Sequence, residues 1–286
     1  MDKLTEGYGL IEGPVWDESQ GLIFSDVLLG GVYLLDKSGG VSSVFEHRRG
    51  IGGMAMHEAG GLIVTGRNVS YKPFDGGETK LILDRNPDAN NVGYNDLTTD
   101  RLGRIYVGSL GSSPVFDDGL GPTPGDLYFI DTDGSSKIVA KDILLTNGLA
   151  FSPDGSVLYH SDSSRKLINC YAVSESGDLG RKQEFAVVAN GVPDGLVVSE
   201  DGRVWVALAG GGHGVAVFEP GGRETEMIKI PQPMCTSVCF GGENMESLFI
   251  VSGSDGSNSK TAGAIYKIDV GVAGCPVIPA KIDLPD

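Results

Sequence analysis

The feature of this sequence that most restricts its fold is a repeat of about 45 residues that fills the chain. Each copy begins with a short apolar run beside a Gly-containing turn and continues through a second turn into a β-rich run. The leading residues of the six copies are Glu12, Gly52, Asn95, Asn147, Asp194 and Thr236. Most copies add a third β-rich run that ends on an acidic residue, as in 32–36, 127–131 and 265–269. Propeller blades have this length and four strands each, so the sequence predicts an all-β, six-bladed β-propeller with four-stranded blades.

The repeat also predicts the domain organisation. Six copies occupy the whole chain, so residues 1–286 are expected to form a single propeller domain. Glycine accounts for 44 of 286 residues, about twice its usual share, as expected for many tight turns between short strands. A β-sandwich is the main rival fold, but sandwiches do not repeat at this period.

The net charge excludes some classes of partner. The formal charge is −16, which leaves no basic surface for nucleic acid and disfavours an anionic membrane. We therefore expect a small-molecule substrate, no nucleic-acid or membrane partner, and a monomer or weak homo-oligomer. The charge itself is explained either by solubility or by a carboxylate-lined cation site.

The N-terminus and the cysteines indicate a cytoplasmic protein. Residues 1–6 contain no apolar segment of a signal peptide, and no run approaches the length needed to span a bilayer. No two cysteines form a C-x-x-C pair or stand with histidines at zinc-finger spacing. They are expected to be reduced and mostly buried, and are Cys170, Cys235, Cys239 and Cys275.

Equivalent positions of a propeller repeat lie on a ring around the central axis. Four of the six leading residues are polar, namely Glu12, Asn95, Asn147 and Asp194. Two carboxylates and two amides make an all-oxygen site suited to a hard cation such as Ca²⁺, Mg²⁺ or Mn²⁺. Asp and Asn before Gly are also ordinary turn formers. Crowding two carboxylates at a channel mouth without a cation would be costly, however, which favours the cation site.

The motifs at these positions resemble those of the senescence marker protein (regucalcin)/gluconolactonase/luciferin-regenerating-enzyme-like family. The resemblance covers nearly the whole chain and rests on the segments 12–16, 95–104, 146–155, 193–195 and 236–242. It implies that Glu12, Asn147 and Asp194 bind one divalent metal ion, with Ca²⁺ the first choice and Mg²⁺, Mn²⁺ or Zn²⁺ as alternatives. It also implies that Asn95 lies over the metal and contacts the substrate.

The sequence departs from this family pattern at position 93. Sugar lactonases commonly carry an arginine two positions before the Asn-Asp pair, whereas this chain has Gly93. The pocket is therefore expected to be roomier and less polar on that side, with Tyr94 either as an aromatic wall that binds substrate or packed in the core. Less hydroxylated lactones should then be preferred, unless Arg67 or the loop 109–124 replaces the missing arginine. That loop, which includes Phe116, Asp117 and Asp118, is expected to be a wall or lid, with a solvated loop as the alternative.

The resemblance implies a lactonase-type hydrolase. The metal ion would polarise the ester carbonyl. Asp194 would act as the base that activates water, Glu12 would anchor the ion, and Asn95 would donate to the substrate oxygen. The four histidines lack metalloprotease spacing, and no G-x-S-x-G elbow occurs. Two alternatives stay open, namely a phosphotriesterase-like hydrolase or lyase on the same site and a non-catalytic calcium-binding propeller.

Overall fold

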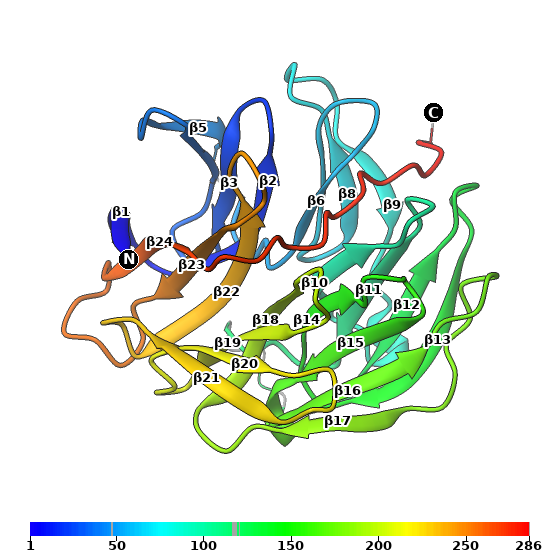
Figure 1. The fold of residues 1–286 in the computed structure, drawn as a ribbon. Helices are drawn as coiled ribbons and strands as arrows, with labels where there is room; N and C mark the ends of the chain where they lie inside the picture. The colour runs from blue at the N-terminus through cyan, green and yellow to red at the C-terminus, as the bar shows by residue number, and fades with distance from the viewer. Residues whose placement is uncertain (47, 116–118, 120, 286) are drawn as a thin grey trace.

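The structure of the protein is a computed structural model that describes residues 1–46, 48–115, 119 and 121–285. In this part of the chain, six antiparallel sheets of four strands each are arranged as the blades of a propeller (Figure 1). The predicted six-bladed propeller with four-stranded blades is therefore confirmed. The described residues include no α-helix, and two short 3₁₀ segments, η1 (Pro87–Ala89) and η2 (Ser163–Arg165), lie in connections between strands.

Blades 1 to 5 each consist of four consecutive strands. The strands of blades 1 to 3 are β2 (Ile11–Asp17), β3 (Gly21–Asp26), β4 (Val32–Asp36), β5 (Val41–Phe45), β6 (Met54–Met56), β7 (Leu62–Val64), β8 (Val69–Lys72), β9 (Lys80–Leu83), β10 (Gly93–Thr99), β11 (Ile105–Leu110), β12 (Gly125–Ile130) and β13 (Ser136–Ile143). Those of blades 4 and 5 are β14 (Thr146–Phe151), β15 (Val157–Asp162), β16 (Leu167–Ala172), β17 (Gln183–Val187), β18 (Val192–Val198), β19 (Val204–Ala209), β20 (Gly214–Phe218) and β21 (Glu224–Lys229).

Blade 6 joins the two ends of the chain. Three of its strands are β22 (Met234–Gly241), β23 (Ser247–Gly253) and β24 (Gly263–Asp269). The fourth is the N-terminal strand β1 (Asp2–Tyr8), which pairs antiparallel with β24. The last repeat therefore completes its sheet with residues that precede the first one. This pairing closes the ring of blades through backbone hydrogen bonds.

The hydrophobic core lies between neighbouring blades. Because each sheet packs against a blade on either side, its middle strands are buried on both faces, and all residues of β3 and β19 are buried. Large aromatic side chains connect successive blades. Trp16 of blade 1 stacks on Phe249 of blade 6 at 5.2 Å between ring centroids, and Trp205 of blade 5 meets Phe240 of blade 6 edge-on at 5.6 Å. These contacts fix the blades, and hence their innermost strands, relative to one another.

A β-bulge interrupts the innermost strand of five blades at the residue that leads the repeat. The shift lies between Glu12 and Val15 in β2, and equivalent shifts occur in β10, β14, β18 and β22. A bulge places one extra residue in its strand and redirects a side chain. In these five blades, the bulge therefore gives the leading residue of the repeat a side-chain direction that differs from that of a regularly paired strand residue.

Glycines after the bulged residues allow the innermost strands to approach closely. A Cβ at Gly148 would lie 2.3 Å from the backbone nitrogen of Leu196, and a Cβ at Gly195 would lie 2.1 Å from Oγ of Ser237. The polar-residue–glycine pairs of the repeat are thus explained by packing at the axis as well as by turn formation.

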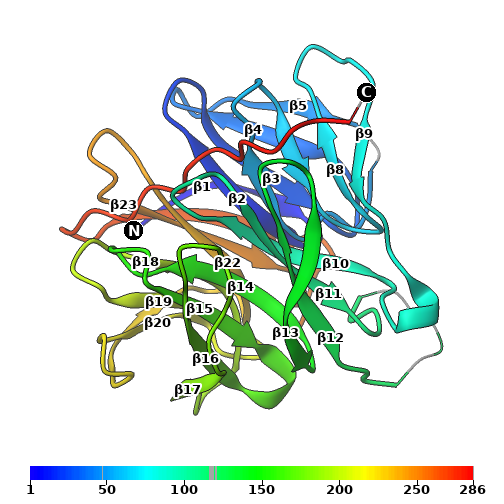
Figure 2. The ribbon, with the colours of Figure 1, turned by 90° about the vertical axis from the view of Figure 1, so that its right-hand side faces the viewer.

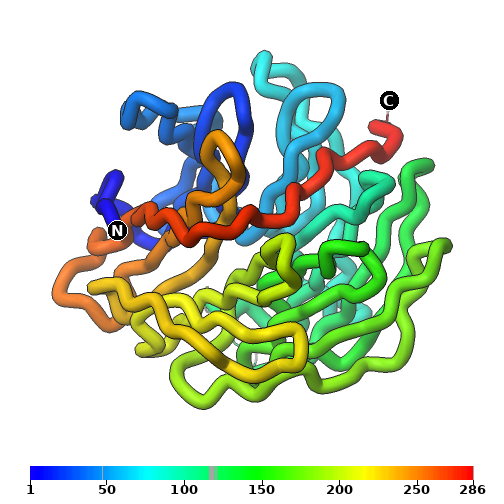
Figure 3. Tube along the Cα trace, in the orientation of Figure 1, coloured from blue at the N-terminus to red at the C-terminus, as the bar shows by residue number. Residues whose placement is uncertain are grey.

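A C-terminal tail, residues 270–285, crosses the end of the axis where the innermost strands finish. Figure 3 shows this tail running over the blades from β24 towards the opposite side of the molecule. Cys275 N donates to Val198 O at 2.8 Å, and Ala280 N donates to Met56 O at 2.7 Å. Beneath the tail lies a cavity of about 690 Å³. We call the opposite end of the axis, where the innermost strands begin, the open end, because the tail does not cross it (Figure 3).

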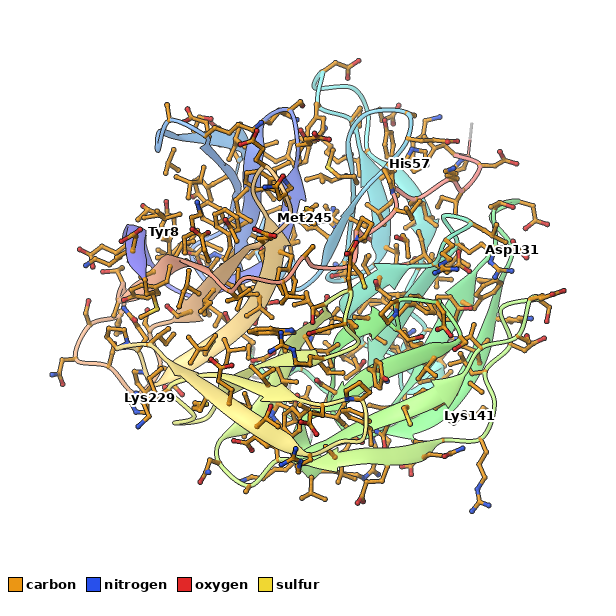
Figure 4. The ribbon with its side chains drawn as sticks, viewed as in Figure 1. Tyr8, His57, Asp131, Lys141, Lys229 and Met245 are labelled. Carbon is orange, nitrogen blue, oxygen red and sulfur yellow. The ribbon has the colours of Figure 1, made fainter. Side chains whose placement is uncertain are left out.

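Two side chains labelled in Figure 4 lie beside this tail. His57 Nε2 is 3.0 Å from Ile282 O, and Gly274 N donates to Met245 O at 2.9 Å. No disulfide joins the four cysteines; Cys235 is buried and the other three are half-buried. Across the described residues, we find no helix with the length and apolarity that a bilayer crossing requires.

Candidate active site

The structure brings the four predicted ring residues together at the open end of the axis. Glu12 begins the bulge of β2, and Asn95, Asn147 and Asp194 occupy the equivalent places in β10, β14 and β18. Blade 2 differs, because its ring residue is Gly52 and a Cβ there would lie 2.2 Å from Oδ1 of Asn95. The side chain of Asn95 therefore occupies the space that blade 2 leaves free.

A chain of hydrogen bonds fixes the orientation of both amides. Ser163 Oγ donates to Pro193 O at 2.6 Å, so it must accept the hydrogen bond from Asn147 Nδ2 at 2.9 Å. This orientation leaves Asn147 Oδ1 as an acceptor, and Asn95 Nδ2 donates to it at 2.8 Å. Asn95 Nδ2 also donates to Thr146 O at 2.8 Å. Both hydrogens of the Asn95 amide are thus used within the protein, and the expected donation from Asn95 to a substrate oxygen would require one of these bonds to be exchanged.

Of the two ring carboxylates, Asp194 is buried and Glu12 is half-buried, and neither has a cationic partner among the described residues. Asp194 is 5% exposed, and its Oδ1 has no hydrogen-bond partner. Burial, followed by the charge of Asp96, raises the pKa of Asp194 well above its ordinary value. Burial also raises the pKa of Glu12, and the charges of Asp194 and Asp96 add to this effect. The site therefore favours any ligand that supplies positive charge.

Asp96 is a third carboxylate of this region, and the sequence reasoning assigned it no role. Burial raises its pKa to about 7, although Leu97 N donates to its Oδ1 at 2.8 Å. Asp96 lines the cavity beneath the C-terminal tail, on the other side of the ring from the open end. Asp96 directly follows Asn95 in the bulge of β10, and a bulge allows two adjacent side chains to face the axis. This position could have identified Asp96 as a candidate site residue.

These residues fit a divalent cation. The described residues contain no cluster of three His, Cys, Asp or Glu side chains that could hold a metal. A cation between Glu12 and Asp194 would therefore also need an amide oxygen, and Asn147 Oδ1 is oriented to provide one. An all-oxygen set of this kind suits Ca²⁺, Mg²⁺ or Mn²⁺. The partnerless Oδ1 of Asp194 is the observation that most favours such an ion.

His160 contacts Thr146, the residue that precedes Asn147 in β14. It is fully buried, and its Nε2 lies 2.6 Å from Oγ1 of Thr146, the residue whose carbonyl accepts from Asn95. Burial lowers the pKa of His160 to about 4, so its imidazole is neutral near pH 7. The histidine thus has a structural position next to the amide network.

Tyr94 lies in the core instead of at the site. It is 1% exposed, its ring meets Tyr128 edge-on, and its hydroxyl donates to Asp84 O at 2.9 Å. Tyr94 precedes the bulge of β10, so its side chain keeps the regular strand orientation towards the interior between blades. We therefore do not retain Tyr94 as a substrate-binding residue.

The space beside Gly93 is filled, and the expectation of a roomier pocket there is wrong. A Cβ at position 93 would lie 2.7 Å from Gly66 O, because the β7–β8 connection pairs with Tyr94 through two backbone hydrogen bonds. The same Cβ would lie 3.6 Å from the Cα of Arg67. An arginine side chain is excluded at position 93, but another arginine stands directly beside it.

The loop 109–124 leaves β11 at the open end of the axis and returns in β12. Its two edges are joined by a hydrogen bond from Thr123 N to Ser112 Oγ at 3.2 Å. The residues on which its expected role as a wall or lid depends, Phe116, Asp117 and Asp118, lie outside the described residues. On the right of Figure 2 the connection with η1 stands on the same side of the molecule.

The fold and the site together define a class of protein, a six-bladed propeller with a carboxylate–amide site at the open end of its axis. Residues 10–254 match the family described as "SMP-30/Gluconolactonase/LRE-like region". The chain belongs to this family, as the motifs of the sequence indicated.

Individual relatives agree with this assignment. A 6-deoxy-6-sulfogluconolactonase of Pseudomonas putida is 32% identical over 275 residues, covering 92% of each chain. A pentonolactonase of Haloferax volcanii is 28% identical and covers 96% of this chain and 95% of its own. The solved structure of a luciferin-regenerating enzyme has a TM-score of 0.87 at 25% identity, over 98% of this chain and 97% of that one. The protein is a lactonase-type hydrolase.

Proposed function

We propose that the protein hydrolyses a sugar lactone at the axial site, with one divalent cation held by Glu12, Asn147 and Asp194. The single observation that carries this proposal is the buried, partnerless Oδ1 of Asp194 near the half-buried carboxylate of Glu12 and an oriented amide oxygen. The sugar-lactone substrates named for two relatives support the substrate class. We place Ca²⁺ first, because a carboxylate–amide oxygen set suits a large, hard cation.

Each side chain has a role in this proposal. The bound cation would supply Lewis-acid polarisation of the lactone carbonyl. Asp194 would accept the proton of the attacking water on a carboxylate oxygen that is not bound to the cation. Glu12 contributes charge, and Asn147 contributes an amide oxygen whose direction Ser163 fixes. Asn95 contacts the sugar through Oδ1, which can accept from a substrate hydroxyl while Nδ2 remains bonded within the protein.

Two further properties accompany the proposal. The four unpaired cysteines support a reducing compartment such as the cytoplasm. The net charge of −16 supports a small-molecule substrate in preference to nucleic acid.

A substrate and metal screen tests the proposal. The cation-free protein is assayed with gluconolactone, a pentonolactone, an alkyl γ-lactone and a phosphotriester, after correction for spontaneous hydrolysis. Ca²⁺, Mg²⁺, Mn²⁺ and Zn²⁺ are then added back singly. We expect at least a 100-fold gain in kcat/KM for a sugar lactone with one of these ions, and smaller gains for the alkyl lactone and the phosphotriester. Full activity in the presence of a strong chelator would contradict the metal assignment, and turnover of the phosphotriester alone would contradict the substrate class.

A further inference from the structure

Blade 2 contributes no side chain to the ring, but it brings two arginines to the open end of the axis. Arg48 lies in the β5–β6 connection, four residues before Gly52, and Arg67 lies in the β7–β8 connection. These two connections are in contact, since a Cβ at Gly66 would lie 2.7 Å from Gly50 O. Both arginines thus stand on the side of the ring that blade 2 leaves without a polar ligand.

The guanidinium of Arg48 is held by the residue that follows Arg67. Arg48 Nη2 donates to Oδ1 of Asn68 at 3.0 Å, and Asn68 directly follows Arg67 in the chain. Asn68 is fixed in turn by Ser70, whose Oγ donates to the same oxygen at 2.7 Å. The Cα of Arg67 lies 3.6 Å from the place of a Cβ at Gly93, two residues before Asn95 in the chain. The connections that carry the two arginines are therefore neighbours, and they lie beside the start of β10, the strand that carries Asn95.

Among the described residues, no carboxylate forms an ion pair with either of these two arginines. Four of the ten arginines, Arg104, Arg165, Arg203 and Arg223, form ion pairs with Asp or Glu. Within the described residues, Arg48 and Arg67 are among the six arginines that form none. Arg48 is only half exposed, and burial without an opposing charge lowers its pKa. A guanidinium has five N–H donors, and among the described residues the side chain of Arg48 uses one of them.

The positive charges of Arg48 and Arg67 lie on a protein whose net charge is strongly negative. The chain carries a formal charge of −16, and the ring itself holds the carboxylates of Glu12 and Asp194. An anionic substrate would be repelled from such a surface unless a local positive region received it. Guanidinium groups bind oxyanions with paired, charge-assisted hydrogen bonds.

We propose that Arg48 and Arg67 form a cationic subsite that binds an oxyanion substituent, such as a phosphate, sulfonate or carboxylate, carried by the lactone away from its reacting carbonyl. This inference rests on the proposed function and narrows its substrate class to acidic sugar lactones. The lactone carbonyl would lie at the ring while its charged substituent extends over blade 2. Arg48 and Arg67 then determine specificity, and they take no part in bond breaking.

A pair of substrates that differ only in charge tests the subsite. The ratio of kcat/KM for 6-phosphogluconolactone to that for gluconolactone is measured for the wild type, Arg48→Ala, Arg67→Ala, the double variant and Arg48→Lys. We expect a ratio well above one in the wild type and a fall of about 10- to 100-fold in the double variant, mainly through KM of the charged lactone. Arg48→Lys should restore part of the ratio, because it keeps the charge without the paired donors. Arg223→Ala, which removes an arginine 74% exposed in the β20–β21 turn, is the matched control and should leave the ratio unchanged.

The outcomes separate this inference from the function on which it rests. Equal kcat/KM values for the two lactones in the wild type, or an equal loss for both in the double variant, would overturn the subsite and leave lactone hydrolysis intact. Hydrolysis of neither lactone by the cation-loaded protein would overturn both. Inorganic phosphate should compete with the charged lactone in the wild type and at least 10-fold more weakly in the double variant; equal inhibition would also overturn the subsite.

Discussion

Asn95 Nδ2 donates to Asn147 Oδ1 at 2.8 Å, so the amides of blades 3 and 4 form one oriented pair at the axis. The pair is anchored at one end by Thr146 O and at the other by Ser163 Oγ. Because both anchors have a defined donor or acceptor role, the oxygen of each amide has a fixed direction. The amide oxygen of the proposed cation site is therefore positioned before any ligand binds.

Replacing Ser163 should weaken cation binding without removing a ligand. Ser163→Ala deletes the acceptor of Asn147 Nδ2, so that amide can rotate and turn its nitrogen towards the site. Groups that orient a ligand typically change metal affinity about 10- to 100-fold, and we expect a loss in this range for Ca²⁺, measured by calorimetric titration. Ser176→Ala, at an exposed turn, is the control. Unchanged affinity in Ser163→Ala would show that Asn147 is held by other contacts.

Without a bound cation, the free energy of unfolding should decrease as the pH rises from acidic to neutral values. Folding raises the pKa values of Glu12, Asp96 and Asp194, that of Asp96 to about 7. A carboxyl group whose pKa is raised by folding contributes its full stabilisation of the folded state below its unfolded pKa, near 4. This contribution is lost as the pH rises through the pKa of the folded state. His160, with a pKa of about 4, contributes in the opposite sense between pH 6.5 and 4.

Because three carboxylates oppose one histidine, the free energy of unfolding of the cation-free protein should fall between pH 5 and pH 8. Denaturant titrations in the presence of a chelator would measure this fall. Saturating Ca²⁺ should restore more stability at pH 8 than at pH 5, since the carboxylates are then ionised. A cation-free protein that becomes steadily more stable up to pH 8 would contradict the assigned pKa directions.

Gly148 is predicted to be intolerant of a side chain. A methyl group there would lie 2.3 Å from Leu196 N and 2.6 Å from Asp194 O, and backbone atoms cannot move aside as a flexible side chain can. Gly148→Ala should cost about 3 kcal/mol in the free energy of unfolding. Gly221→Ala, where no atom lies within 4 Å of the added carbon, should cost much less. Similar losses in both variants would show that the approach of β14 and β18 at the axis is not tight.

The repeat in the sequence predicted which residues form the ring at the axis. It did not predict contacts between segments that are far apart in the chain. Glu12, Asn147 and Asp194 share a place in the repeat, and the following glycine marks the bulge that turns each of them to the axis. The sequence left Tyr94 open between the site and the core, because a bulge breaks the alternation of side chains and the sequence does not show on which side of the break a residue lies. The filled space at Gly93 depends on the connection with Gly66, which is 27 positions away and carries no signal of that contact.

Asp194→Asn separates the two roles proposed for this residue. Asparagine keeps an oxygen that can bind a cation, but it cannot accept the proton of the attacking water. General-base catalysis contributes about 10²- to 10⁴-fold, so kcat should fall by that factor even at a cation concentration that saturates the variant. Calorimetric titration of the variant would establish this concentration, and lactone hydrolysis would be measured there.

Glu12→Gln provides the matched comparison, because Glu12 is proposed to hold the cation without accepting a proton. It removes the same amount of charge from the same ring, so its cation affinity should fall about as far as that of Asp194→Asn. Its kcat at saturating cation should nevertheless stay within about tenfold of the wild type, since the base remains. If Asp194→Asn also stays within tenfold, Asp194 is a ligand only. The raised pKa of Asp96, at about 7, would then make this neighbouring carboxyl the next residue to test as the base.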